Sequence, residues 1–195
     1  MGALLRSLLT LLLLLPIWSL AGETVLQRLN KTFAPSSQLT GNYQQTRFVK
    51  HLGVTLNSSG KFSMKKNGGI SWEQTKPFAS ALNISEKEIS FTVEGSPIRV
   101  IGPDVDPVLY SFGRAFLTLL KGDESALQAQ FDVKEDGPKN KWHLNLTPKS
   151  EMIKKAIRGI NIYGDSFVKS VRIEDQGDNY MKIDFQNIHT LGSAK

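Results

Sequence analysis

The stretch Lys61-Phe62-Ser63-Met64-Lys65 alternates polar and apolar side chains at every step. Because successive side chains of a β-strand point to opposite faces, this period of two predicts a strand with one apolar and one polar face. The same alternation recurs in three further runs: Ile89-Ser90-Phe91-Thr92-Val93, Trp142-His143-Leu144-Asn145-Leu146 and Met181-Lys182-Ile183-Asp184-Phe185. Strands of this kind predict an antiparallel sheet wetted on one side, not the uniformly apolar strands of a buried parallel sheet.

Turn-forming residues lie between these runs. Segments 57–60, 67–69, 94–97, 136–138, 163–165 and 176–178 are rich in glycine, asparagine, aspartate, serine and proline. Such residues favour the tight connections between successive antiparallel strands. We therefore expect strands of about 6 to 10 residues that follow one another directly along most of the chain.

Two segments show helical spacing instead. Apolar residues between Glu23 and Phe33 recur every three or four positions, which predicts a short helix that ends before Pro35. A second segment runs from Pro107 to Gly122, residue types suited to a first helical turn and to a C-terminal cap. A further short turn is expected at 124–127. The predicted class is α+β: an incomplete antiparallel barrel whose concave face is covered by the N-terminal helix and the inserted helix.

The first 21 residues have the layout of a signal peptide. Arg6 precedes an apolar run at 8–15, and Ser19 and Ala21 suit the positions read by a signal peptidase. We expect cleavage after Ala21 and one domain over 22–195, with an uncleaved anchor as the alternative. The chain has no cysteine, so neither disulfides nor lipid attachment to a cysteine is expected.

The charge balance is mildly basic. The chain carries 24 basic and 18 acidic residues, and removal of Arg6 with the signal leaves 23 against 18, a net charge of +5. Such a balance favours acidic partners: nucleic acid, anionic lipid headgroups or an acidic protein surface. Export makes nucleic acid the least suitable of the three. We expect a monomer without stable membrane insertion.

Three motifs resemble the outer-membrane lipoprotein carrier family (LolA-like). The register from Gly60 through Trp72 to Pro77 matches the family's strand, turn and tryptophan, with the proline five residues after the tryptophan. Segment 41–48, Gly-Asn-Tyr-Gln-Gln-Thr-Arg-Phe, is similar to the family's opening strand. Leu146-Thr147-Pro148-Lys149 is similar to a later segment of the family, and the order of elements also agrees.

The resemblance implies a periplasmic carrier that receives acyl chains of lipoproteins in a cavity. It also implies cargo taken from an inner-membrane transporter and passed to an outer-membrane receptor. Two residues depart from the family pattern: Lys66 replaces an arginine that helps to hold the lid closed, and Asn67 replaces a proline. Lysine is a flexible point charge without arginine's planar fork of donors, so this latch is in doubt. Weaker closure or a different amphiphile, such as an acylated glycolipid or a polyene-type lipid, is the alternative.

Large apolar residues of the strands and of the inserted helix are the candidates for lining the cavity, although each could equally be ordinary core. A mobile lid and a simply packed helix both fit the insert, and Lys66 is the candidate latch or partner contact. The candidate lining residues are Phe48, Phe62, Met64, Trp72, Leu82, Ile84, Phe91, Val93, Phe112, Phe116, Leu119 and Leu120.

Catalytic chemistry has little support in the sequence. His51, His143 and His189 are far apart and lack metal-ligand spacing, and segment 164–168 does not match a Gly-x-Ser-x-Gly nucleophile elbow. Asp104 and Asp106 are explained by a helix N-terminus. We expect no enzyme activity, no metal and no cofactor. A periplasmic protein-binding module with a filled barrel is the remaining alternative.

Overall fold

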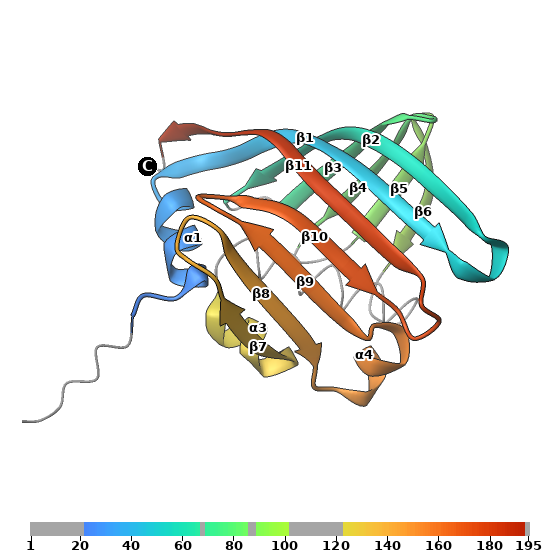
Figure 1. Ribbon diagram of the computed structural model, residues 1–195. Helices are drawn as coiled ribbons and strands as arrows, with labels where there is room; N and C mark the ends of the chain where they lie inside the picture. The colour runs from blue at the N-terminus through green and yellow to red at the C-terminus, as the bar shows by residue number, and fades with distance from the viewer. Residues whose placement is uncertain (1–21, 67–68, 86–88, 102–122, 194–195) are drawn as a thin grey trace, which may run out of the picture.

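The computed structural model describes residues 22–66, 69–85, 89–101 and 123–193. A single mixed-length antiparallel sheet dominates these residues (Figure 1). Its strands are β1 Ser36–Val49, β2 Val54–Lys65, β3 Gly69–Lys76, β4 Ser80–Ile84, β5 Ile89–Val93, β6 Ser96–Ile101, β7 Phe131–Asp136, β8 Trp142–Pro148, β9 Gly159–Gly164, β10 Val168–Glu174 and β11 Tyr180–Ser193. The helices are α1 Val25–Phe33, the 3₁₀ turn η1 Lys50–Leu52, α3 Glu124–Gln130 and α4 Glu151–Ala156.

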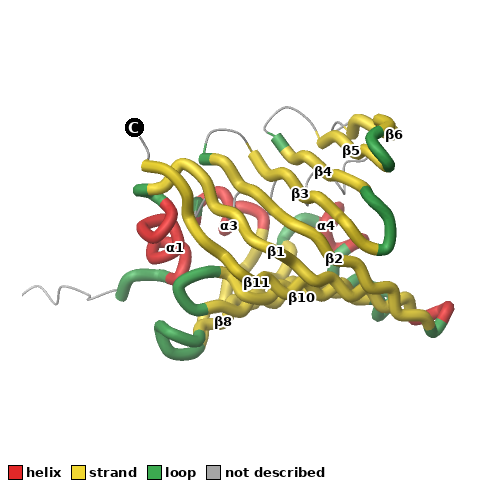
Figure 2. The backbone as a smooth tube through the Cα atoms, turned by 90° about the horizontal axis from the view of Figure 1, so that it is seen from above, coloured by secondary structure: helices red, strands yellow, loops and turns green. Residues whose placement is uncertain are grey.

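The sheet is curved and does not close. Its order is β6-β5-β4-β3-β2-β1-β11-β10-β9-β8-β7, so two meanders meet where β1 pairs with β11, and β6 and β7 are the edges. Figure 2, seen from above, shows the two halves folded toward each other around one concave side. The predicted incomplete antiparallel barrel is confirmed.

The register explains which side becomes the core. Leu39 pairs with Met64, and Tyr43 pairs with Phe185, so the odd-numbered residues of β1 face the concave side together with their partners. The other half contributes Leu144 of β8, opposite Ile162 of β9. These apolar side chains belong to one buried cluster, as the period-two patterns predict.

Helix α1 closes one end of the sheet (Figure 1). Its N-cap Thr24 forms a capping box with Gln27, and Val25, Leu26 and Phe33 are buried in the core. The predicted segment 23–33 agrees closely with the observed helix. Helix α3, capped by Asp123, extends the expected turn at 124–127 by three residues.

Helix α4 was not expected from the sequence. It is short, begins after the N-cap Ser150 and buries only Ile153, so it carries almost no apolar periodicity. The predicted signal peptide at 1–21 and the predicted helix at 107–122 lie outside the described residues. No helix among the described residues is long and apolar enough to cross a bilayer.

Candidate functional site

Four aromatic rings gather on the concave face. Tyr43, Phe62, Trp72 and Phe185 come from β1, β2, β3 and β11, which are neighbours in the sheet. The ring centroids of Tyr43 and Trp72 are 4.1 Å apart, and those of Phe62 and Phe185 are 5.1 Å apart. Edge-to-face contacts join Phe185 to both Phe62 and Trp72. The rings form a rigid apolar wall across the centre of the sheet.

A small residue makes room for the rings, and burial keeps them uncharged. Gly41 lies opposite Phe62 on β1, and a Cβ atom at Gly41 would come within 2.6 Å of the Phe62 ring. Burial raises the pKa of Tyr43 to about 12, although its hydrogen bond with Trp72 opposes the rise. The Tyr43 phenol therefore stays neutral at physiological pH, and the wall carries no charge.

An apolar cavity of about 40 Å³ lies between α1 and this wall. Helix α1 contributes two lining residues, and β1 and β2 together contribute three. The other four come from β10, from the residue just before it and from β11. All nine described lining residues are apolar: Leu29, Phe33, Leu39, Phe62, Met64, Phe167, Val168, Phe185 and Ile188. The cavity offers van der Waals contacts and almost no hydrogen-bonding groups, which suits a hydrocarbon.

Most of the candidate lining residues share the concave face. Phe62 and Met64 line the cavity directly. The cross-strand pairs Phe62–Trp72, Trp72–Leu82 and Leu82–Phe91 continue the same face over β3 to β5. Ile84 lies on this face because it pairs with Ile70, and Val93 lies on it because it is two residues after Phe91 in the same strand. Phe112, Phe116, Leu119 and Leu120 lie outside the described residues.

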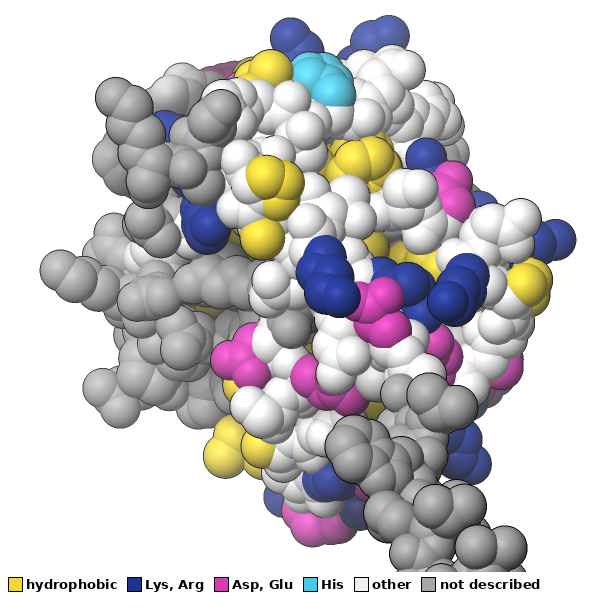
Figure 3. Space-filling model, turned by 90° about the vertical axis from the view of Figure 1, so that its left-hand side faces the viewer, with side chains coloured by type: hydrophobic (Ala, Val, Ile, Leu, Met, Phe, Trp, Pro, Cys, Tyr) yellow, Lys and Arg dark blue, Asp and Glu magenta, His cyan; other side chains and the backbone are white. Residues whose placement is uncertain are grey.

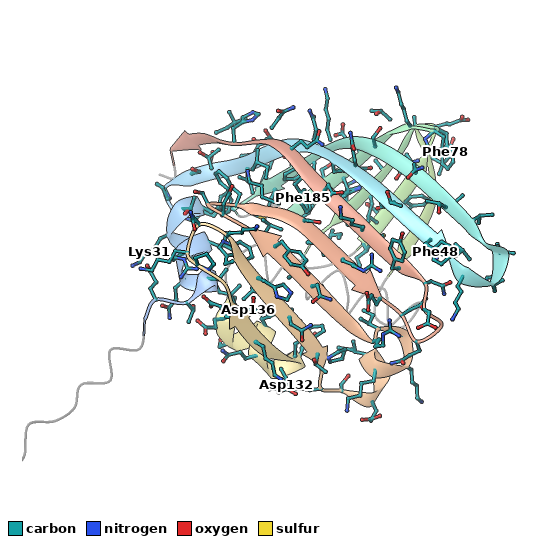
Figure 4. The ribbon with its side chains drawn as sticks, viewed as in Figure 1. Lys31, Phe48, Phe78, Asp132, Asp136 and Phe185 are labelled. Atoms are coloured by element: carbon teal, nitrogen blue, oxygen red, sulfur yellow. The ribbon has the colours of Figure 1, made fainter. Side chains whose placement is uncertain are left out.

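Phe48 lies on the opposite face. Phe48, labelled in Figure 4, pairs with Tyr180 of β11. The two rings stack on the convex side with centroids 5.5 Å apart. Even-numbered residues of β1 point away from the cavity, so Phe48 is not part of the candidate site. Phe185, by contrast, lines the cavity and was not among the candidates, although it ends one of the alternating runs.

The side chain of Lys66 forms a hydrogen bond to the main chain at the C-terminal end of α1. Its Nζ atom donates to the carbonyl oxygen of Ala34, the C-cap of α1, at 2.8 Å, and its main-chain nitrogen donates to Ser37 at 3.0 Å. A cation is favoured at a helix C-terminus, where unpaired carbonyl groups concentrate negative charge. A lysine thus makes one hydrogen bond to the helix that borders the cavity.

The N-terminal end of α1 is held by the edge of the other half. The main-chain nitrogen of Val25 donates to the Glu135 carboxylate at 2.9 Å, and Arg28 forms an ion pair with the same carboxylate at 3.5 Å. The Thr24 hydroxyl donates to Glu124 at 2.9 Å. Polar contacts therefore fix α1 at both ends, while its middle covers the cavity.

The comparisons with known proteins agree with this geometry. The family model for the outer membrane lipoprotein carrier protein LolA-like family matches residues 16–179. The chain belongs to this LolA-like family. Members of the family are periplasmic carrier proteins rather than enzymes.

Solved structures show distant likenesses to this LolA-like chain. A DUF1329 family protein from Desulfovibrio piger is 12% identical, with a TM-score of 0.48, and the match covers 87% of this chain and 92% of that one. A LolA superfamily protein from Nitrosomonas europaea is 9% identical, with a TM-score of 0.45, covering 87% and 93%. No curated protein matches the sequence.

Proposed function

We propose that this LolA-like protein is a periplasmic carrier that binds the acyl chains of lipoproteins between α1 and the concave sheet and delivers them toward the outer membrane. The observation that carries the proposal is the wholly apolar cavity, bordered on one side by a helix and on the other by the aromatic wall. Acyl chains have no hydrogen-bonding groups, so a dry apolar space is all that their recognition requires.

The cavity must widen to receive a chain. Its volume of about 40 Å³ is far below the roughly 300 Å³ at which ligand pockets begin. Long ladders of main-chain hydrogen bonds fix β1, β2 and β11 in place. Helix α1 is therefore the lining element whose movement loses the fewest main-chain hydrogen bonds to the rest of the fold.

The energies support this movement. Releasing α1 breaks a few partly exposed hydrogen bonds, each worth about 0.5–1.5 kcal/mol. An acyl chain that takes over the apolar contacts of α1 gains about 0.8 kcal/mol for each buried methylene, or about 8 kcal/mol for ten of them. Displacing α1 also uncovers its buried Val25, Leu26 and Phe33, so cargo drives the opening when its acyl chain buries more apolar surface than the helix gives up.

Uptake of a fluorescent fatty acid by delipidated protein tests the proposal. A dansyl-labelled fatty acid should brighten on entering the apolar site. Val168 lines the cavity and is nearly buried, so Val168→Phe should fill the space and weaken uptake about tenfold or more. Val54→Phe, on an exposed part of β2, is the matched control and should bind like the parent protein.

Equal uptake by the parent protein and Val168→Phe, or no uptake by either, would contradict the proposal. Solvent extraction of protein purified from its own periplasm then identifies the cargo. A lipoprotein supports the family's usual function. An acylated glycolipid or a polyene-type lipid supports the alternative raised by Lys66, whose single hydrogen bond holds α1 less firmly than a forked guanidinium could. The inner-membrane transporter and outer-membrane receptor are part of the same proposal.

A further inference from the structure

Strongly exposed apolar side chains gather at one end of the molecule. Among the described residues, seven large apolar side chains are conspicuously exposed. Two of them, Tyr163 and Leu191, lie at the end of the sheet where α1 is. The other five lie at the opposite end: Leu52 (63% exposed), Val54 (39%), Leu56 (56%), Phe78 (50%) and Met152 (53%).

The strand register fixes their location. Ser36 pairs with Ser193 beside α1, so Phe48 and Tyr180 mark the far end of the β1–β11 pair. The β1–β2 hairpin, the β3–β4 turn with Phe78 and the β8–β9 connection with α4 all lie at this far end (Figures 1 and 4). These three protrusions are called the far rim below.

Each protrusion of the far rim also carries basic side chains. Lys50 precedes Leu52 in the hairpin, Lys76 precedes Phe78 in the turn, and Lys154 and Lys155 follow Met152 in α4. Within the described part of the chain, Lys76 and Lys155 form no ion pair, whereas Lys50 and Lys154 pair with Asp178 and Glu151. Acidic side chains also lie at this end, since Glu151 belongs to α4 and Asp178 lies in the β10–β11 turn. Basic and acidic side chains are likewise intermixed on the face seen from the α1 end (Figure 3).

We propose that the far rim docks on the surface of an anionic lipid bilayer. Exposed apolar side chains on protruding turns enter the boundary between headgroups and acyl chains, and neighbouring lysines pair with anionic headgroups. Three apolar points on separate protruding turns can each enter a deformable lipid surface without a matching pocket on the partner. The net charge of +5 that remains once Arg6 is removed with the signal adds long-range attraction in the same direction.

The far rim is continuous with the concave face. Val54 and Leu56 pair with Val49 and Arg47, which places them on the same side of β2 as Phe62. Docking through the far rim would therefore bring the end of the half-barrel opposite α1 against the lipid, next to the edge of the concave face. The inference goes beyond the proposed carrier function, since it concerns a surface that takes no part in the cavity.

Vesicle flotation with the mature, cargo-free protein tests the inference. One set of vesicles contains phosphatidylglycerol and phosphatidylethanolamine, and the other contains only zwitterionic phosphatidylcholine. We expect reversible binding to the anionic vesicles that weakens several-fold as salt is raised. The double variant Leu52→Ser/Phe78→Ser should lower the partition coefficient at least tenfold.

The matched control is Tyr163→Ser/Leu191→Ser, which removes the two exposed apolar side chains at the α1 end. It should bind the vesicles like the parent protein. The inference is overturned if the parent protein floats with neither kind of vesicle, if it binds both kinds equally, or if the control loses as much binding as the far-rim variant. Fatty-acid uptake by the far-rim variant should be unchanged, which separates this test from that of the carrier function.

Discussion

Phe62→Ala should lower stability and raise affinity for acyl chains at the same time. The Phe62 ring packs against Phe185 at 5.1 Å and Trp72 at 6.1 Å, and it is only 5% exposed. Truncating a buried phenylalanine to alanine costs about 3–5 kcal/mol in the free energy of unfolding. The space released joins the existing cavity, so part of the widening that cargo needs is already made.

The comparison with Phe48→Ala makes this prediction specific. Phe48 stacks on Tyr180 on the convex face and is only half-buried, so its loss should cost about 1 kcal/mol. Urea unfolding monitored by circular dichroism gives both stabilities, and dansyl fatty-acid titration gives both affinities. We expect acyl affinity to rise only for Phe62→Ala, and bound fatty acid to restore part of its lost stability.

A protein-binding module with a filled barrel would respond differently. In that case Phe62→Ala would lose stability with no gain in acyl binding, and added fatty acid would not raise the midpoint of unfolding. Either result would refute the reasoning that the aromatic wall borders a cargo site. The same titration on Phe48→Ala guards against a general effect of losing an aromatic side chain.

Two further predictions concern α1 and pH. Lys66→Met should remove the bond to Ala34, lower the unfolding free energy by no more than about 1 kcal/mol and speed fatty-acid uptake in stopped-flow measurements, whereas Lys65→Met should leave the rate unchanged. Hydrogen bonds from Arg172 and Arg158 lower the pKa of Glu174 below 4.5, and those from Lys50 and Arg158 lower the pKa of Asp178. Their stabilising effect is therefore present at neutral pH and lost as the pH falls through these lowered values. Unfolding measured from pH 7 to pH 3 should show a smaller loss for Arg158→Gln than for the parent protein.

Local alternation was enough to predict the sheet and much of its concave face. Phe62, Trp72, Leu82 and Phe91 sit in runs whose period of two survives in the structure, and cross-strand pairing puts them together. Phe48 shows the limit of this reasoning. Its face depends on β1 running without a shift from Tyr43 to Phe48, an odd number of steps, and a change of one residue would have turned it inward.

Long-range partners could not be read from one sequence. Lys66 donates a hydrogen bond to a carbonyl group 32 residues away in sequence, and no pattern in the residues around Lys66 predicts that partner. Leu29 and Phe33 were recognisable as the apolar stripe of a helix, but their place over the cavity depends on where α1 docks. Helix α4 is too short for a periodic signal, and only its N-cap Ser150 marks its start.

The pairing of β1 with β11 has a consequence for biogenesis. These are the first and last strands described, yet they lie side by side in the middle of the sheet, with Phe48 opposite Tyr180. The central ladder therefore cannot form until nearly the whole polypeptide has emerged, and contacts of such large sequence separation slow folding. In a chain that crosses a membrane from its N-terminus onward, one edge of β1 would stay unpaired until β11 arrives. Chaperones that protect unpaired strands should matter more for this protein than for one whose neighbours in sequence are its neighbours in space.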